Sequence, residues 1–219
     1  MYGLKDNVAR KAGTMGKEEN KEIEFWTQDE FQAFLECVAD KPISYYAFEM
    51  LYWTGIREGE LLALTPADFN FEKKTLRINK SYQRLEGKDV ITDPKTPKSN
   101  RTIVMPDFLA VEMENFISSL YGIKDDDRIF TISKSYLHHE MDRGAKLAGV
   151  KRIRIHGLRH SHISLLINLR FSALAIGERV GHEAVDITYH YAHLFPTVQT
   201  DMAAQLETER EALVNVRKE

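Results

Sequence analysis

The stretch His156-Gly157-Leu158-Arg159-His160-Ser161-His162 holds the densest set of chemically useful side chains in this 219-residue sequence. An upstream stretch, Thr54-Gly55-Ile56-Arg57-Glu58-Gly59-Glu60-Leu61, adds a second arginine, and Gly181-His182 and Tyr191 follow downstream. Arginine binds phosphate through a planar fork of donors that stays charged at any working pH. Tyrosine can act as a covalent nucleophile once its high pKa is offset. A site that holds and attacks a phosphodiester needs such groups, so the sequence predicts cleavage of nucleic acid.

The composition of the chain indicates the kind of protein and its cellular compartment, but says less about its fold. With 43% hydrophobic residues the chain can bury a real core, and one domain, or one domain plus an appendage, is expected. The single cysteine, Cys37, excludes an internal disulfide, and no segment has the length of a membrane span or the layout of a secretory signal. We therefore expect a soluble protein of a reducing compartment, with cytoplasmic localisation and no membrane partner.

The charge of the chain is unevenly distributed. A net charge of −3 argues against a nucleic-acid binder, but the stretch from Arg143 to Gly177 has seven Lys/Arg and no acid. Nine further Lys/Arg lie between Lys73 and Arg101. The two basic stretches could form one face for a polyanion, and ordinary solvated charge is the alternative.

Local patterns at the start of the chain predict a linker followed by helices. Residues 1–24 lack an apolar period and are expected to be a linker. Thr27-Gln28-Asp29-Glu30 is a capping-box pattern that begins a helix, and a second apolar run leads from Tyr45 to Trp53. Gly55 permits a tight turn before helical character resumes from Glu58 to Leu64, so the arginine of this turn is expected at a helix start.

The segment from Asp68 to Met105 has the texture of short strands. Runs such as Thr75–Ile78 and Arg101–Val104 are separated by glycine and proline, which predicts a small antiparallel sheet. Helical spacing returns from Asp107, and the helices expected after it cover 107–121, 133–148, 157–169, 172–180, 186–194 and 197–216. The predicted fold class is mainly α with a small antiparallel β-sheet.

The two opening stretches, together with Val180-Gly181-His182 and Tyr191-Ala192-His193-Leu194, resemble in order and spacing the catalytic domain of the tyrosine recombinase (phage integrase) family. The resemblance covers residues 25–196 and is greatest to integrases of temperate phages and conjugative transposons from low-GC Gram-positive bacteria. It implies the fold shared by DNA breaking-rejoining enzymes, with a catalytic domain over 25–219. It also implies that residues 1–24 follow a core-binding domain that is missing from this sequence.

Preplaced cations act where negative charge develops during attack on a phosphodiester. Arg57 and Arg159 suit this role, and His182 is a third donor. For Arg57 the alternative is a helix-start arginine in a surface ion pair, and for Arg159 it is a helix-capping or packing role. The resemblance implies that Glu60, one turn beyond Arg57, supports His156, and a local surface ion pair is the alternative.

Tyr191 is the expected nucleophile. A free phenol has a pKa of about 10, so forming the phenolate at neutral pH costs roughly 4 kcal/mol unless a base or cations help. His156 suits the role of base or proton shuttle. Tyr189 is the local rival, but the two positions lie about 200° apart on a helix and cannot face one phosphate. The family pattern, a tyrosine followed by x-His-Leu, selects Tyr191.

The leaving 5′ oxygen needs a general acid. The family supplies it from a lysine on a mobile sheet loop, and the segment from Asp93 to Arg101 resembles that loop. Lys95, which precedes a threonine in this segment, is the implied counterpart, and Lys98 is the rival.

A metal site must be considered because all eight histidines fall between His138 and His193. Two histidine pairs, His160 with His162 and His190 with His193, could in principle bind zinc. No cysteine is near them, and acids are missing from 156–177. We therefore expect no metal and no cofactor, and histidines outside the catalytic set are expected to pack, to cap helices or to contact the DNA backbone.

These residues lead to one expected function and three alternatives. The expected function is a site-specific DNA recombinase (integrase) domain that cleaves and rejoins strands through a 3′-phosphotyrosyl intermediate, for integration or excision of a mobile element. A type IB topoisomerase shares the fold and the tyrosine but usually has a lysine at the position of His156. The others are a non-catalytic DNA-binding protein that retains the fold and a metal-dependent phosphoesterase.

The expected partners follow from the same resemblance. They are double-stranded DNA, further copies of the chain, and accessory DNA-bending proteins. The chain is expected as a tetramer on paired DNA sites and as a monomer or weak dimer when free. Thr197 can cap a helix over 197–219 with an imperfect apolar stripe, which is expected to pack on a neighbouring subunit, and folding back on its own domain is the alternative.

Overall fold

The computed structural model describes residues 23–93, 99–181, 202–208 and 210. Most of the predicted linker and the expected helix at 186–194 lie outside the described residues. So do the candidate residues Lys95, Lys98, His182, Tyr189 and Tyr191. Residues 202–208 are helical, which agrees with the expected 197–216 helix over that part. No helix in the described parts of the chain has the length and apolarity that crossing a bilayer requires.

Helix α2 (Gln28–Glu36) begins at the predicted capping box. Thr27 Oγ1 accepts a hydrogen bond from the Glu30 amide at 3.3 Å, and Glu30 Oε2 accepts one from the Thr27 amide at 2.8 Å. Trp26, just before the helix, is buried and donates from its amide to Ser161 Oγ at 2.8 Å. This contact holds the residue just before α2 against the histidine-rich helix, 135 residues later.

Helix α3 (Pro42–Thr54) is the central helix of the core. It ends at Gly55, which adopts a left-handed conformation at φ +66°, where a residue with Cβ is disfavoured. A Cβ on Gly55 would also lie 2.6 Å from the His162 ring. The predicted turn is therefore confirmed, and α4 (Glu58–Leu61) follows with Arg57 as its N-cap residue. This α-helix ends at Leu61, three residues before the predicted end.

The β region forms two sheets, whereas the sequence predicted one. Strands β1 (Phe69–Asn70), β2 (Thr75–Ile78) and β5 (Arg101–Val104) make an antiparallel sheet in the order β1-β2-β5. Strands β3 (Ser81–Leu85) and β4 (Lys88–Thr92) pair only with each other as a hairpin. The chain leaves the first sheet after Ile78, where Lys80 Nζ turns back to bind Asp68 Oδ2 at 2.5 Å beside η1 (Pro66–Asp68).

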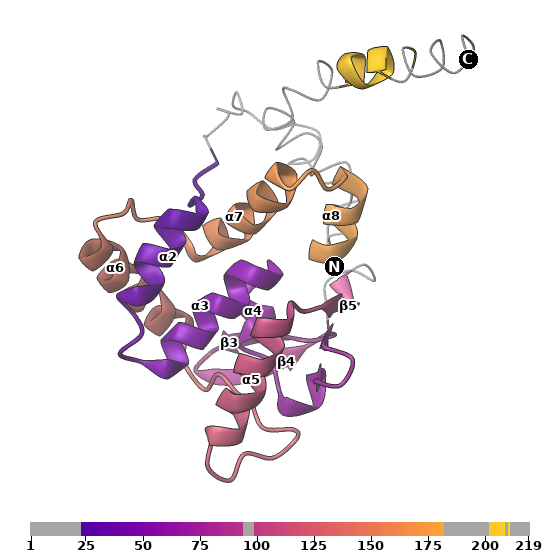
Figure 1. The fold of residues 1–219 in the computed structure, drawn as a ribbon. Helices are drawn as coiled ribbons and strands as arrows, with labels where there is room; N and C mark the ends of the chain where they lie inside the picture. Colours follow the sequence, from indigo (N-terminus) through magenta and orange to yellow (C-terminus); the bar gives the residue numbers. More distant parts are fainter. Residues whose placement is uncertain (1–22, 94–98, 182–201, 209, 211–219) are drawn as a thin grey trace, which may run out of the picture.

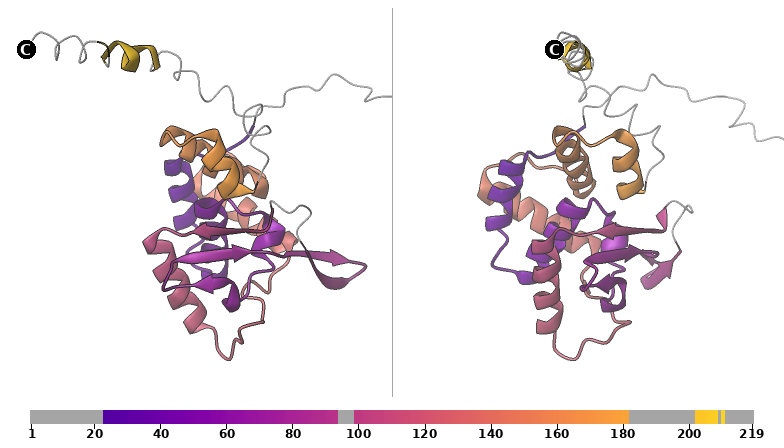
Figure 2. Two further views of the ribbon diagram at one scale, coloured as in Figure 1. Left: turned by 90° about the vertical axis from the view of Figure 1, so that its right-hand side faces the viewer. Right: turned by 45° about the vertical axis from the view of Figure 1, so that its right-hand side comes forward.

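The second half of the described chain is helical, as predicted. Its helices are α5 (Asp107–Ser119), α6 (Lys134–Ala148), α7 (Ile155–Asn168) and α8 (Ala173–Val180). Helix α7 starts two residues earlier than predicted, which places His156 in its first turn. The views in Figures 1 and 2 place α8 between α7 and the β5 end of the three-stranded sheet, and residue contacts join α8 to both.

Candidate active site

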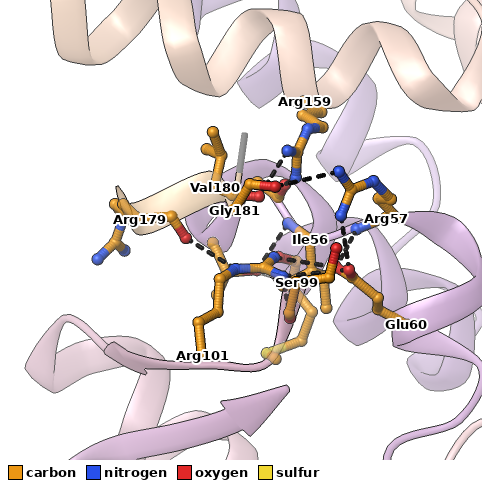
Figure 3. A network of polar contacts seen from close by, with 12 residues as sticks. Ile56, Arg57, Glu60, Ser99, Arg101, Arg159, Arg179, Val180 and Gly181 are labelled. Carbon is orange, nitrogen blue, oxygen red and sulfur yellow. Dashed lines mark hydrogen bonds and ion pairs between the residues drawn. The ribbon is translucent and has the colours of Figure 1, made fainter. Parts of the chain in front are cut away.

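Three arginines from three elements converge on the C-terminal end of α8 (Figure 3). Arg101 Nε donates to the carbonyl of residue 179 at 3.0 Å, Arg159 Nη2 to that of residue 180 at 2.5 Å, and Arg57 Nη2 to that of residue 181 at 3.3 Å. The last carbonyls of a helix lack intrahelical partners and carry its negative dipole end, so cations are favoured there. The end of α8 thus gathers side chains from α4, β5 and α7 at one point.

Arg159 is enclosed, with a relative exposure of 2%. Its Nη1 donates to the carbonyl of Gly55 at 2.5 Å, so one guanidinium joins α7, the turn after α3 and the end of α8. A guanidinium stays charged in a protein interior and requires acceptors there. The two backbone carbonyls supply them.

Arg57 is the more accessible of the two predicted phosphate-binding arginines, with 36% of its side chain exposed. Its amide donates to Glu60 Oε2 at 2.8 Å and its Nη1 to Glu60 Oε1 at 2.9 Å. The side chain is thereby held at the start of α4 while part of it faces solvent. The predicted position at a helix start is confirmed.

Glu60 lies between two arginines and is buried, so it is not the surface ion pair that the sequence left open. Arg101 Nη1 and Nη2 donate to its two oxygens at 3.1 and 2.9 Å, opposite Arg57. Burial by itself raises the pKa of this carboxyl, but the hydrogen bonds and charges of the two arginines outweigh it and hold the pKa below its usual value. Among described residues the hydrogen bonds of Glu60 go to these arginines, so support of His156 stays a prediction.

His156 is an exposed residue in the first turn of α7, and its ring packs edge-on against the His160 ring at 4.8 Å between centroids. Desolvation by the surrounding protein lowers its pKa, and the nearby Arg159 and Arg57 guanidiniums lower it further. The neutral imidazole is therefore favoured, as a general base requires.

A cleft of about 580 Å³ opens beside these groups. Arg57 and His156 line it together with strand β3 and the start of α6, where Arg84 and Lys134 add positive charge. The cleft places two of the predicted site residues beside these two further cations, and Glu58 is the one acid among its lining residues, so its lining carries net positive charge. Such a surface suits a polyanion.

The predicted basic face is only partly supported. Arg143 pairs with Glu140 and Asp40, both at 2.8 Å, and Arg152 Nε pairs with Asp142 at 2.7 Å. Lys80 pairs with Asp68, Arg159 is buried, and the Arg101 side chain is only 7% exposed. Acids thus pair with two of the seven Lys/Arg between Arg143 and Gly177, and Arg159 is buried, so the accessible basic surface is smaller than predicted.

Sequence reasoning gave no role to Arg101 or Arg179. Arg179, on α8, donates from Nη1 to the Val104 carbonyl at 3.0 Å and from Nη2 to the Trp53 carbonyl at 3.2 Å. Its Nε donates to His162 Nε2 at 3.1 Å. Their positions in the sequence could have indicated a role at the site. Arg101 ends the segment that carries Lys95 and Lys98, and Arg179 immediately precedes Val180-Gly181-His182.

His162 is a buried neutral histidine, a packing role that agrees with the sequence expectation. Burial lowers its pKa to about 3, and the charges of Arg179 and Arg159 act in the same direction. Its Nε2 must lack a proton in order to accept from Arg179 Nε.

This pKa predicts a pH-dependent stability. Below about pH 6.5 the unfolded chain binds a proton on residue 162 that the folded chain excludes, so the free energy of unfolding should fall by about 1.4 kcal/mol per pH unit as the pH is lowered toward 3. The variant His162→Gln, whose amide oxygen can accept from Arg179, should lack this contribution. Urea unfolding at pH 6.5 and pH 5 should show about 2 kcal/mol more loss for the unaltered protein than for the variant. Equal losses would show that residue 162 titrates normally.

Metal binding receives no support from the residues that the structure describes. Within them, no group of three or more His, Cys, Asp or Glu side chains is arranged to hold a metal ion. His182, His190 and His193 lie outside the described residues, so this observation does not extend to them.

Comparisons with known proteins agree with this geometry. The model of the phage integrase family matches residues 24–197. The ICEBs1 integrase of Bacillus subtilis (strain 168) is 30% identical over 92% of this chain and 58% of its own length. A XerC-like tyrosine recombinase of Caldanaerobacter subterraneus subsp. tengcongensis is 25% identical over 89% of this chain and 56% of its own length. The chain thus spans less than two thirds of either curated relative.

A solved structure shows the same fold. The Tn1549 transposon integrase, in complex with a circular intermediate DNA, superposes with a TM-score of 0.72 at 21% identity, covering 87% of this chain and 68% of that one. The family match extends over most of the chain, including both arginine stretches. This chain therefore belongs to the phage integrase family.

Proposed function

We propose that this chain is the catalytic domain of a site-specific DNA recombinase that integrates or excises a mobile element. The observation that carries the proposal is the convergence of Arg57 and Arg159, from helices 102 residues apart, on the end of α8 beside His156. The relatives named as an integrase of ICEBs1 and as a transposon integrase bound to DNA support the same activity.

The proposed cleavage is a transfer of one phosphoester bond. The Tyr191 hydroxyl attacks phosphorus and gives its proton to His156, the new bond from Tyr191 Oη to phosphorus forms, and the bond to the 5′ oxygen breaks. Lys95, or its rival Lys98, protonates that leaving oxygen. The product is a 3′-phosphotyrosyl ester and a free 5′ hydroxyl. Rejoining reverses the transfer, so no nucleotide cofactor is consumed.

His182 and Tyr191 lie outside the described residues, and the sequence motifs support their proposed roles. Gly181, whose carbonyl accepts from Arg57, immediately precedes His182, and Tyr191 follows ten residues after Gly181.

A nicked suicide substrate tests the proposal. Cleavage near the nick releases a short strand that cannot rejoin, so the covalent protein–DNA adduct accumulates and is counted on a denaturing gel. DNA binding without an adduct would favour the non-catalytic alternative. Relaxation of supercoiled plasmid carrying no paired recombination sites would favour the type IB topoisomerase alternative.

We also propose that the chain acts as a tetramer on paired DNA sites, with accessory DNA-bending proteins, and is a monomer or weak dimer when free. In the described helical residues 202–208, Met202 and Leu206 are exposed, so an apolar stripe is available to a partner.

Removal of the C-terminal tail should impair the assembly of paired-site complexes. Truncation after Phe195 removes this stripe but leaves the arginines and the cleft, so binding to a single site should change little while assembly of paired-site complexes falls at least tenfold. Native gel electrophoresis with one-site and two-site DNA measures both. Equal assembly by the truncated and full chains would exclude packing of the tail in trans.

A further inference from the structure

Arg101 has a largely buried side chain that donates hydrogen bonds to three different parts of the site. Only 7% of its side chain is exposed. Its Nη1 and Nη2 bind the two oxygens of Glu60, its Nε binds the carbonyl of Arg179 at 3.0 Å, and Nη1 also reaches the Ser99 carbonyl at 3.1 Å (Figure 3). A planar guanidinium bound this way has little freedom to rotate.

The carboxylate held by Arg101 in turn holds Arg57. Glu60 Oε1 accepts from Arg57 Nη1 and Oε2 accepts from the Arg57 amide, so the same two oxygens serve both arginines. The position of the Glu60 carboxylate therefore depends on Arg101. Through it, Arg101 fixes both the backbone and the guanidinium of Arg57.

The other end of Arg101 fixes α8. The carbonyl of residue 179 that it binds is followed by the carbonyls that bind Arg159 and Arg57. Arg101 also binds the carbonyl of Ser99, which directly follows Lys98 in the segment that carries the two candidate lysines. One side chain thus joins α4, the last turn of α8 and the start of β5.

We propose that Arg101 is a positioning residue that aligns Arg57 and the end of α8 for attack on the scissile phosphate, an inference that rests on the proposed recombinase function. Four of its five N–H donors bind protein oxygens, so we assign Arg101 a role through Glu60 and α8 and no direct contact with the phosphate. Displacements of about 1 Å in an active site can cost about 100-fold in rate. Loss of this link should therefore slow the chemical step far more than it weakens DNA binding.

Two substitutions separate positioning from folding. Arg101→Met removes the link and leaves Glu60 with Arg57 as its remaining partner among the described residues, so it should slow adduct formation about 100-fold or more. Arg101→Lys keeps a positive charge beside Glu60 and should fold with near-normal stability. A single ammonium cannot bind both Glu60 oxygens and two carbonyls in the same geometry, so the lysine variant should still react about tenfold more slowly.

The assay uses the full chain with saturating nicked suicide DNA in a single turnover, at a temperature where circular dichroism shows each variant folded. Separate titrations should give dissociation constants for DNA within about threefold of the unaltered protein. Arg128→Met is the matched control, because Arg128 also binds a backbone carbonyl, of Leu62, and a carboxylate, of Asp89, but none of the α8 carbonyls. Its rate should stay within about threefold.

The outcomes are distinguishable. If the unaltered protein forms no adduct, the proposed function fails. If the unaltered protein forms the adduct, and the folded Arg101→Lys and Arg101→Met variants form it as fast as the unaltered protein does, the positioning role is wrong. The proposed function then stands. A loss of rate in Arg128→Met as large as that in Arg101→Met would also overturn the role, since the defect would then follow general destabilisation.

Discussion

Tyr191→Phe should bind DNA as well as the unaltered protein does and should form no covalent adduct. The substitution removes the one oxygen proposed to become bonded to phosphorus, and no rearrangement of Arg57 or His156 can replace it. Binding should persist because phosphate contacts by cationic groups supply most of the affinity of such proteins. A nicked suicide substrate followed on a denaturing gel measures the adduct, and a gel shift at fixed salt measures binding.

The neighbouring tyrosine provides the matched control. Tyr189→Phe removes the same atom two positions earlier, and on the helix predicted from the sequence the two positions would be about 200° apart. It should keep adduct formation within a few fold of the unaltered protein. If Tyr189→Phe loses the adduct while Tyr191→Phe keeps it, the nucleophile has been assigned to the wrong residue.

Features of the fold that depend on neighbouring residues could be read from the sequence. The capping box at Thr27 and Glu30 forms as predicted because both hydrogen bonds lie within one helical turn. The turn at Gly55 forms because a left-handed residue must end α3 before α4 begins. The division of the β region into two sheets was not predictable, since alternation of apolar residues indicates strands but does not identify their partners.

Candidate residues that act through distant partners were harder to predict. Arg57 and Arg159 could be predicted because each lies in a short stretch that resembles a family motif, and arginine is a residue that binds phosphate. Arg101 was not, because its significance depends on Glu60, 41 residues earlier, and on the end of α8, 78 residues later. Likewise, the stretch from Arg143 to Gly177 looks basic in sequence but is partly neutralised by acids that the fold brings beside it.

Arg159→Met should reduce both catalysis and stability. Removal of a preplaced cationic donor from a site where negative charge develops typically costs about 100-fold to 1000-fold in rate. The substitution also leaves the buried carbonyls of Gly55 and Val180 without this donor, and an unsatisfied buried polar group costs about 1–3 kcal/mol. We therefore expect the free energy of unfolding to fall by at least about 2 kcal/mol, measured by urea unfolding.

Arg57→Met separates the two effects of Arg159→Met. Arg57 has a side chain 36% exposed, and Glu60 keeps Arg101 as a partner when Arg57 is lost, so the stability loss should be about 1 kcal/mol or less. Its loss of adduct formation should nevertheless match that of Arg159→Met within about tenfold, because both guanidiniums are proposed to face the same phosphate. The comparison requires single-turnover rates at saturating suicide DNA, at a temperature where both variants are folded. If Arg57→Met reacts at the normal rate while Arg159→Met is slow, Arg57 does not stabilise the transition state, and Arg159 acts through the packing of α8 against α7.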